Sequence, residues 1–106
     1  MITIDDFKKV EIKIGEIISV ENIEGSDKLL KLKVNFGDHE RQVLSGIKAY
    51  FPEPQALVGK RYPFVTNLAP RTMMGLESQA MILATGGAET PFALFETTGV
   101  PGDRVK

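Results

Sequence analysis

Alternation between apolar and polar residues is most regular from Leu30 to Phe36. Every second residue there is large and apolar, and the residues between are lysine or asparagine. Because successive side chains of a β-strand point to opposite faces, this pattern predicts a strand with one face in the core and the other in solvent. The apolar set is Leu30, Leu32, Val34 and Phe36, and the polar set is Lys31, Lys33 and Asn35.

The segment Val10–Glu21 predicts a first strand whose alternation is interrupted. Gly15 and Ile17 fall out of step with the apolar residues around them. A residue out of step indicates a bulge or a strong bend, which a small barrel needs in order to close. The residues assigned to the core face are Ile12, Ile14, Ile18 and Val20.

Three further segments have the pattern of strands. A hairpin turn at Gly37–Asp38 leads into a third strand that carries Arg41. The stretch Lys60–Leu68 predicts a fourth strand, in which Pro63 indicates an edge position or a bend. A fifth strand is expected at Ser78–Thr85.

The remaining segments predict short helical turns. Thr3 is the expected N-cap, with Asp6 three residues later, of a helix over Ile4–Val10. This helix is expected to bury Phe7 and Val10. Between the third and fourth strands two prolines exclude a long helix, so we expect a connection with one short helical turn.

Five short strands with bends predict an all-β fold, a five-stranded OB-fold barrel with a short N-terminal helix and a C-terminal extension. The 106 residues leave no room for a second domain, so residues 1–106 are expected to form one. The extension beyond Gly87 is expected to cover a barrel end, to meet a partner chain, or both. Its apolar residues are Phe92, Leu94, Phe95 and Val100.

Composition excludes several classes of function. There is no cysteine, so disulfide frameworks and thiolate metal sites or nucleophiles are excluded. The one histidine, His39, lies in a predicted turn without a serine or cysteine partner, so we expect no catalytic residue, metal site or cofactor. No apolar run reaches the roughly 20 residues of a membrane span and the start of the chain is acidic, so a cytoplasmic location is expected. Met1 directly precedes the predicted helix, which favours an independent start.

Charge is unevenly distributed along the chain although the net charge is −1. Residues 1–27 contain three basic and seven acidic residues, whereas residues 28–80 contain eight basic and four acidic ones. A basic middle indicates a local surface for an anionic ligand. If Lys13 has the outer parity of the first strand, then the predicted positive groove on one solvent face is formed by Lys13, Lys31, Lys33 and Arg41.

The segment Asn67–Ala84 combines hydrogen-bonding groups with a shaped backbone. Asn67, Ser78 and Gln79 offer donors and acceptors, and Arg71 offers a planar cation that pairs with phosphate or stacks on a base. The segment is either a packed turn or a loop that presents these groups. Its place after the fourth strand, where OB folds bind oligonucleotides, favours presentation.

Four phrases, in order, resemble the tRNA-binding domain that occurs as a stand-alone dimeric protein and as an appendage of methionyl-tRNA synthetase. The resemblance covers almost the whole chain. The phrases are FKKVEIKIGEI, DKLLKLKVNFGDHERQVLSGI, NLAPRTMMGLESQAMILA and PGDRV.

This resemblance implies an OB barrel that binds the outside corner of the tRNA elbow by shape. It also implies a homodimer formed through the segments that flank the barrel, and a methionyl-tRNA synthetase catalytic chain as a possible partner, with no enzymatic activity in this chain itself. The positions that match the family's tRNA contacts are Lys31, Lys33, Asn67, Ser78 and Met81.

Two features keep a second function open. Thr72 and Met74 are neutral where many relatives are basic, so the resemblance implies modest affinity for tRNA. Met73 and Met74 either plug the barrel or pack against unpaired bases. A dimeric secretion-related chaperone is another branch of the resemblance, and these methionines suit a groove for an unfolded peptide.

Overall fold

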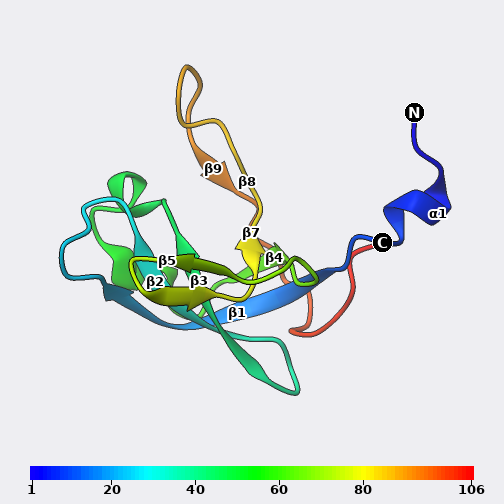
Figure 1. The fold of residues 1–106 in the computed structure, drawn as a ribbon, viewed down its shortest axis with the longest axis horizontal. Helices are drawn as coiled ribbons and strands as arrows, with labels where there is room; N and C mark the ends of the chain where they lie inside the picture. Colours follow the sequence, from blue (N-terminus) through cyan, green and yellow to red (C-terminus); the bar gives the residue numbers. More distant parts are fainter.

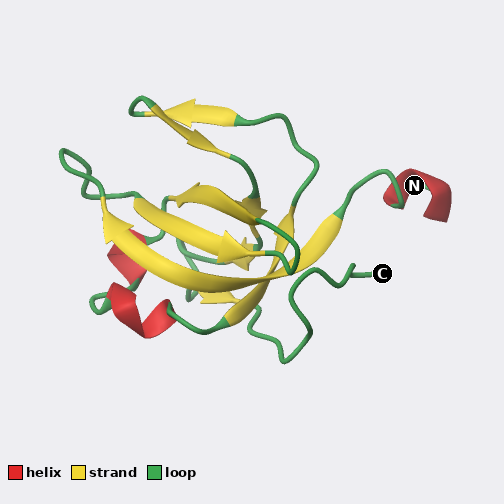
Figure 2. Ribbon diagram, turned by 90° about the horizontal axis from the view of Figure 1, so that it is seen from below, coloured by secondary structure: helices red, strands yellow, loops and turns green.

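The computed structural model describes residues 1–106 and contains a five-stranded antiparallel sheet in the order β3–β2–β1–β4–β7 (Figure 1). The sheet bends along β1 and curls into a partly open barrel (Figure 2). The predicted all-β fold with an OB-type barrel is confirmed. The strands are β1 (Ile12–Asn22), β2 (Leu30–Asn35), β3 (Glu40–Ser45), β4 (Arg61–Val65) and β7 (Met81–Ile82).

Short elements decorate this barrel. The connection between β3 and β4 contains two 3₁₀ turns, η1 (Lys48–Tyr50) and η2 (Pro54–Leu57), where one turn was expected. The predicted fifth strand is broken, because only β7 pairs with β4 and the next residues leave the sheet to form a separate hairpin. The additional elements are α1 (Ile4–Phe7) and the hairpins β5 (Arg71–Met73) with β6 (Leu76–Ser78) and β8 (Ala84–Thr85) with β9 (Ala93–Leu94).

The core follows the regular alternation of β2. Leu30, Leu32 and Val34 are completely buried, and the lysines between them lie on the outer face. Gly15 of β1 faces this core, and a Cβ atom there would lie 2.4 Å from Cγ1 of Val34. Only glycine therefore leaves room for the side chains of Val34 and Phe36 to pack against β1 at this position.

The predicted bulge in β1 is confirmed, but of the four residues assigned to its core face only Val20 belongs to the core cluster. The register against β2 shifts between Ile17 and Ser19, so Ile17 is completely buried and Ile18 is 37% exposed. Ile14 is buried on the opposite face from Ile17, where it packs near Gly99 of the C-terminal segment. An extra residue in a strand exchanges the two faces beyond it, which periodicity alone does not locate.

Pro63 does not mark an edge, because β4 lies between β1 and β7. Pro63 lies opposite Ile14 in the ladder with β1. The N–H and C=O of Ile14 are bonded instead to Asp103 and Gly102. This register position therefore requires no N–H from β4.

The N-terminal helix α1 is capped as predicted and is exposed. Thr3 and Asp6 form a complete capping box. Phe7 and Val10 are 36% and 41% exposed, so the prediction that they are buried is wrong for a single chain. In Figure 1, α1 extends away from the barrel beside the C-terminus. No helix in the structure has the length and apolar character needed to cross a membrane.

The C-terminal extension covers part of the barrel. Phe92 and Leu94 pack against the core, whereas Phe95 and Val100 are exposed. The last residues run antiparallel to the start of β1, with a bridge between Lys13 and Arg104. The prediction that this extension covers the barrel is confirmed for its first half.

Met74 and Gly75 form the two-residue turn of the β5–β6 hairpin. Their φ angles are 52° and 77°, as a type I′ turn requires, and Met74 is the one non-glycine residue of the chain with a positive φ. Met74 is 55% exposed, so it does not plug the barrel.

Asparagine adopts this backbone conformation more easily than other side chains. We therefore expect the Met74→Asn variant to be more stable than Met74→Ala by about 1 kcal/mol. Urea unfolding of both variants measures the difference, and the alanine variant controls for loss of the methionine side chain. Equal stability of the two would contradict the assigned turn.

Candidate functional site

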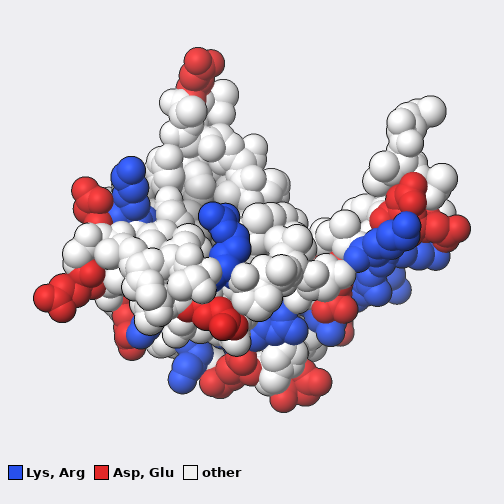
Figure 3. Space-filling model, in the orientation of Figure 1, with Lys and Arg blue, Asp and Glu red and all other residues white.

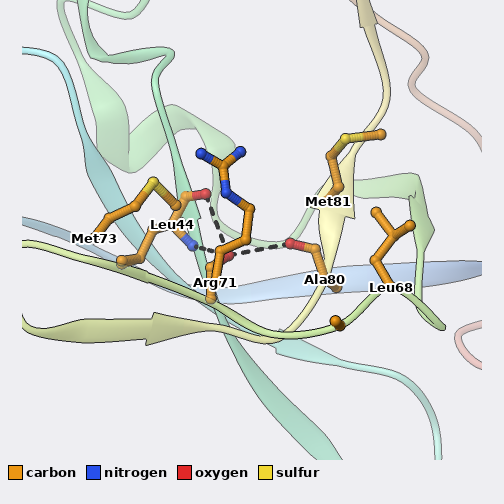
Figure 4. Close-up of a pocket in the computed structure, with 8 residues that line it drawn as sticks. Leu44, Leu68, Arg71, Met73, Ala80 and Met81 are labelled. Atoms are coloured by element: carbon orange, nitrogen blue, oxygen red, sulfur yellow. Dashed lines mark hydrogen bonds between the residues drawn. The ribbon is translucent and has the colours of Figure 1, made fainter.

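The loop between β4 and β7 closes the barrel by lying against β3. The hydroxyl of Ser78 accepts a hydrogen bond from the N–H of Leu44 at 3.0 Å and lies 3.2 Å from the carbonyl oxygen of Ala80 (Figure 4). Ser78 is only 7% exposed. Its hydroxyl therefore replaces a backbone hydrogen bond that a continuous ladder between β3 and the loop would contain.

Gln79 makes the only backbone bond in this closure. Its N–H donates to the carbonyl oxygen of Gln42 at 2.9 Å, and its side-chain oxygen accepts from the N–H of Gln42 at 3.0 Å. The amide of Gln42 in turn donates to the carbonyl oxygen of Glu77 at 2.9 Å. Ser78 and Gln79 thus fix the end of the loop to β3.

Arg41 ties the two ends of the loop together. Its guanidinium donates to the carbonyl oxygen of Thr66 at 2.6 Å and to that of Gln79 at 3.3 Å, and it lies over the ring of Phe36. Arg41 pairs with Val34 in the ladder, so it lies on the core side of β3 at the barrel end.

Lys13 also lies at this barrel end. It pairs with the buried Phe64 across β1 and β4, and its ammonium is 3.8 Å from Glu11. The prediction that Lys13 and Arg41 share one face with Lys31 and Lys33 is therefore wrong. The β1 bulge and the register of β3 place the two pairs on opposite sides of the sheet.

Two carboxylates, Glu11 and Asp38, lie at the barrel end. The hydroxyl of Thr66 donates to Glu11 at 2.6 Å and holds the pKa of that carboxyl below its usual range, with a further contribution from Lys13. The ring of His39 lies 2.5 Å from Asp38 and lowers the pKa of Asp38. Both carboxyls thus stay ionised at neutral pH.

Asn67 anchors the N-terminal segment. Its side-chain oxygen accepts from the N–H of Glu11 at 2.9 Å, and its side-chain nitrogen donates to the carbonyl oxygen of Lys9 at 2.7 Å. On the other side, Arg104 donates to the carbonyl oxygen of Lys8 at 2.6 Å. These contacts hold the chain where α1 leaves the barrel.

Lys31 and Lys33 lie on the outer face of β2, which we call the lysine face. Lys31 is 3.0 Å from Glu21 of β1, and Lys33 is 3.9 Å from Glu40 of β3. These ion pairs leave no net charge on the four side chains. In Figure 3, acidic and basic side chains lie next to one another along the lower part of the visible surface, and a group of basic ones lies beside α1.

An apolar cavity of about 130 Å³ lies between β3 and the loop. Arg71 and Met81 extend from its rim in the same direction (Figure 4). Arg71 makes no ion pair and no side-chain hydrogen bond within the chain, and Met81 is 47% exposed. The other residues that line the cavity are Leu44, Leu68, Ala69, Met73, Ser78 and Ala80.

The structure brings this rim close to the lysine face. Lys31 lies directly opposite Leu44 in the ladder, and Leu44 lines the same cavity as Arg71. Sequence reasoning did not identify Leu44 and Leu68 as cavity residues, since apolar residues in a strand and a loop carry no distinguishing signal. Gln42 was missed as well, although its polar parity in β3 matches that of Lys33. No group of three or more potential metal ligands is present in the structure.

Comparison with known proteins finds one family. Residues 12–103 match the family model described as "Putative tRNA binding domain". A methionine–tRNA ligase of Caldanaerobacter subterraneus is 49% identical over 83 residues, which cover 78% of this chain and 13% of the ligase. The chain spans 12–16% of the length of the curated methionine–tRNA ligases that it matches.

Several solved structures resemble the whole chain, and two of them are more than 25% identical to it. A MetRS-related protein from Pyrococcus horikoshii has a TM-score of 0.92 at 34% identity, over 100% of this chain and 98% of that one. The CsaA chaperone protein from Picrophilus torridus has a TM-score of 0.86 at 26% identity, over 100% of both chains. The similarity therefore includes the segments that flank the barrel.

Removing the Ser78 hydroxyl tests its structural contribution. The Ser78→Ala variant leaves the buried N–H of Leu44 without a partner, so we expect a loss of about 1–3 kcal/mol in the free energy of unfolding. Denaturant unfolding measures this loss. The matched control is Ser19→Ala on the outer face of β1, which removes a hydroxyl that makes no hydrogen bond within the chain. Equal stability of the two variants would contradict the closure by Ser78.

Proposed function

Because the chain belongs to the tRNA-binding domain family, we propose that it binds the outside corner of the tRNA elbow, mainly by shape. The observation that carries this proposal is the free guanidinium of Arg71 beside the exposed Met81, at the rim of a cavity next to the lysine face. A cation without a protein partner keeps its donors available for phosphate. An exposed thioether beside it offers a polarizable apolar surface for a base or sugar.

The site residues divide into contacts and supports. Arg71, Met81, Lys31 and Lys33 are the proposed contacts with RNA. Ser78, Gln79 and Arg41 hold the loop that carries Arg71, while Asn67 fixes the neighbouring N-terminal segment. Lys13, paired with Glu11 at the barrel end, contributes charge at longer range. In this proposal the supporting residues act only by holding the backbone in position, and four side chains contact the RNA.

The ion pairs of the lysine face favour recognition by shape over attraction by charge. A lysine paired with a carboxylate contributes less to the release of counterions from RNA. The adjacent groove on this face is lined by Lys31, Lys33, Glu21 and Gln42. Uncharged and acidic groups beside the lysines favour a ligand whose phosphates have a defined spacing.

We further propose that the protein acts in the cytoplasm without catalytic activity of its own, supplying tRNA affinity to a methionyl-tRNA synthetase. The curated ligases that it resembles are much longer than this chain. Aminoacylation would then take place on another polypeptide or another part of a longer one.

A homodimer is the proposed assembly. The exposed apolar residues of the N-terminal segment include Ile4 and Phe7. A second apolar hollow of about 410 Å³ lies beside Phe95 and Val105. Apolar surface concentrated at the two flanking segments is typical of an interface between copies.

The dimer is tested by changing Ile4, which is 65% exposed in α1. We expect the wild-type chain to sediment as a dimer and Ile4→Glu to shift it toward the monomer, because a carboxylate would be buried at the interface. Lys8→Glu, just after α1, is the matched control and is expected to remain dimeric. A monomeric wild-type chain in sedimentation velocity would contradict the proposal.

A peptide-binding function is the second candidate. The CsaA chaperone has a similar fold over the whole chain. The apolar cavity beneath Arg71, with Leu68 50% exposed at its rim, offers a place for an apolar peptide side chain. Competition between tRNA and an unfolded protein distinguishes the two candidates: tRNA binding that is unaffected by excess unfolded protein favours the first.

The tRNA proposal is tested by fluorescence anisotropy with whole tRNA over a series of salt concentrations. Replacing Glu21 by glutamine frees Lys31, so the Glu21→Gln variant is expected to bind more tightly and to increase the salt slope by up to about 1. Arg71→Ala is expected to weaken binding and to reduce the slope by about 1.

Two matched variants control for general effects of charge. Glu24→Gln removes an exposed carboxylate three residues after Glu21 that makes no ion pair. Lys106→Ala removes an exposed cation far along the chain from Arg71. Both are expected to bind almost as the wild type does. Equal affinity for tRNA and for an unstructured RNA, or no effect of Arg71→Ala, would contradict the proposed site.

A further inference from the structure

Another cavity, distinct from the two described above, lies between η1 and the β8–β9 hairpin and has a volume of about 360 Å³. We call it the Tyr62 cavity. It shares no lining residue with the cavity beneath Arg71. Its volume is at the lower end of the range of about 300–1,000 Å³ that ligand sites occupy. Its lining residues include Tyr50, Phe51, Tyr62, Phe92, Leu94 and Glu96.

The aromatic walls of this cavity are held in place. The rings of Tyr50 and Phe92 stack with centroids 4.1 Å apart, and Phe51 meets Phe92 edge to face at 6.0 Å. The hydroxyl of Tyr50 donates to the carbonyl oxygen of Gly87 at 2.9 Å. These contacts connect η1 to the hairpin, so the cavity is formed before any ligand arrives.

Tyr62 supplies a hydrogen-bonding group at the cavity. The residue as a whole is 3% exposed, and its hydroxyl makes no hydrogen bond within the chain; since no buried side-chain oxygen or nitrogen lacks a partner, this hydroxyl is open to water at the cavity. Burial raises the pKa of Tyr62, and the charge of Glu96 raises it further. The hydroxyl is thus a free donor and acceptor that a ligand in the cavity can reach.

Glu96 supplies a negative charge beside the same cavity. Its position is fixed because the N–H of the next residue, Thr97, donates to the carbonyl oxygen of Arg61 at 3.0 Å, adjacent to Tyr62. The carboxylate has one partner, the ammonium of Lys60 at 3.6 Å, and both side chains are about half exposed. A second cation can therefore replace this surface pair at little cost.

These groups select a cation on an apolar stem. A phosphate would be repelled by Glu96, and a purely apolar side chain would leave the Tyr62 hydroxyl without a partner. Aromatic walls with a carboxylate attract a cation, and a planar guanidinium both stacks on rings and donates several hydrogen bonds at once. Lysine has the charge but neither the plane nor the forked donors.

We propose that the Tyr62 cavity binds an arginine side chain of a polypeptide, with the guanidinium between the Tyr62 hydroxyl and the Glu96 carboxylate. The aliphatic part of the arginine packs against Leu94 and the aromatic walls. This site is separate from the proposed RNA surface, so the domain holds a basic peptide segment and tRNA at the same time.

The probe for this site is Nα-acetyl-arginine amide, compared with the citrulline analogue, which has a similar shape and no charge. In ¹H–¹⁵N NMR titrations of the full chain, we expect the amide signals of Tyr62 and residues 92–96 to shift with saturation. Loss of a charge-assisted contact is expected to weaken binding of the citrulline probe by about tenfold or more. Saturated binding of tRNA is expected to leave the arginine affinity unchanged.

Four variants determine whether the named residues form the site. Glu96→Gln and the nearly isosteric Tyr62→Phe are expected to weaken arginine binding, whereas Lys60→Gln, which removes the competing cation, is expected to strengthen it. Glu89→Gln is the matched control, because Glu89 is exposed on the same hairpin and does not line the cavity. The amide spectrum of each variant establishes that it is folded, and its tRNA affinity is expected to equal that of the wild type.

Several results would overturn the proposal. They are equal affinity for the arginine and citrulline probes, equal effects of Glu96→Gln and Glu89→Gln, displacement of the arginine probe by tRNA, or no saturation below about 0.1 M probe. The last result, if tRNA binding is intact, would reject the arginine site and leave the proposed function standing.

Discussion

The closure of the barrel between β3 and the loop that precedes β7 is the contact on which the rest of the structure depends. A continuous ladder is absent there. A single backbone bond from Gln79 to Gln42 is supplemented by the Ser78 hydroxyl and by Arg41, which binds carbonyl oxygens at both ends of the loop. Because side chains close the barrel, the loop backbone is free to form the β5–β6 hairpin. The hairpin then covers Leu44 and directs Arg71 outward.

Electrostatic balance is the second constraint. The lysines near the proposed RNA surface are paired with carboxylates, Lys31 with Glu21, Lys33 with Glu40 and Lys13 with Glu11, and the Arg41 guanidinium is bonded to carbonyl oxygens. Arg71 is the exception. A domain with little net charge on its binding face gains little from non-specific attraction, so its affinity depends on how well one ligand shape fits. Such a balance suits a module that must ignore most RNA.

Much of the fold could be predicted from periodicity, and the candidate site could be predicted only in part. The alternation from Leu30 to Phe36 identified β2 and its lysine face. Ile17, which is out of step with the apolar residues around it, identified the β1 bulge. Periodicity did not reveal that the bulge moves Ile18 outward, nor that Arg41 has core parity. Hydrogen-bonding residues such as Ser78 and Asn67 have the same composition signal whether they face a ligand or the backbone, so their bonds within the chain were visible only in three dimensions.

The four methionines report directly on whether tRNA lies over the rim formed by Arg71 and Met81. Methyl NMR of chain labelled at methionine, titrated with whole tRNA, reports Met73 and Met81 at the cavity and Met1 far from it. Single Met→Leu variants assign the signals. If tRNA lies over this rim, the Met81 and Met73 methyls shift with saturation while Met1 stays unchanged. Saturable binding that leaves Met73 and Met81 unmoved would contradict this position of the tRNA.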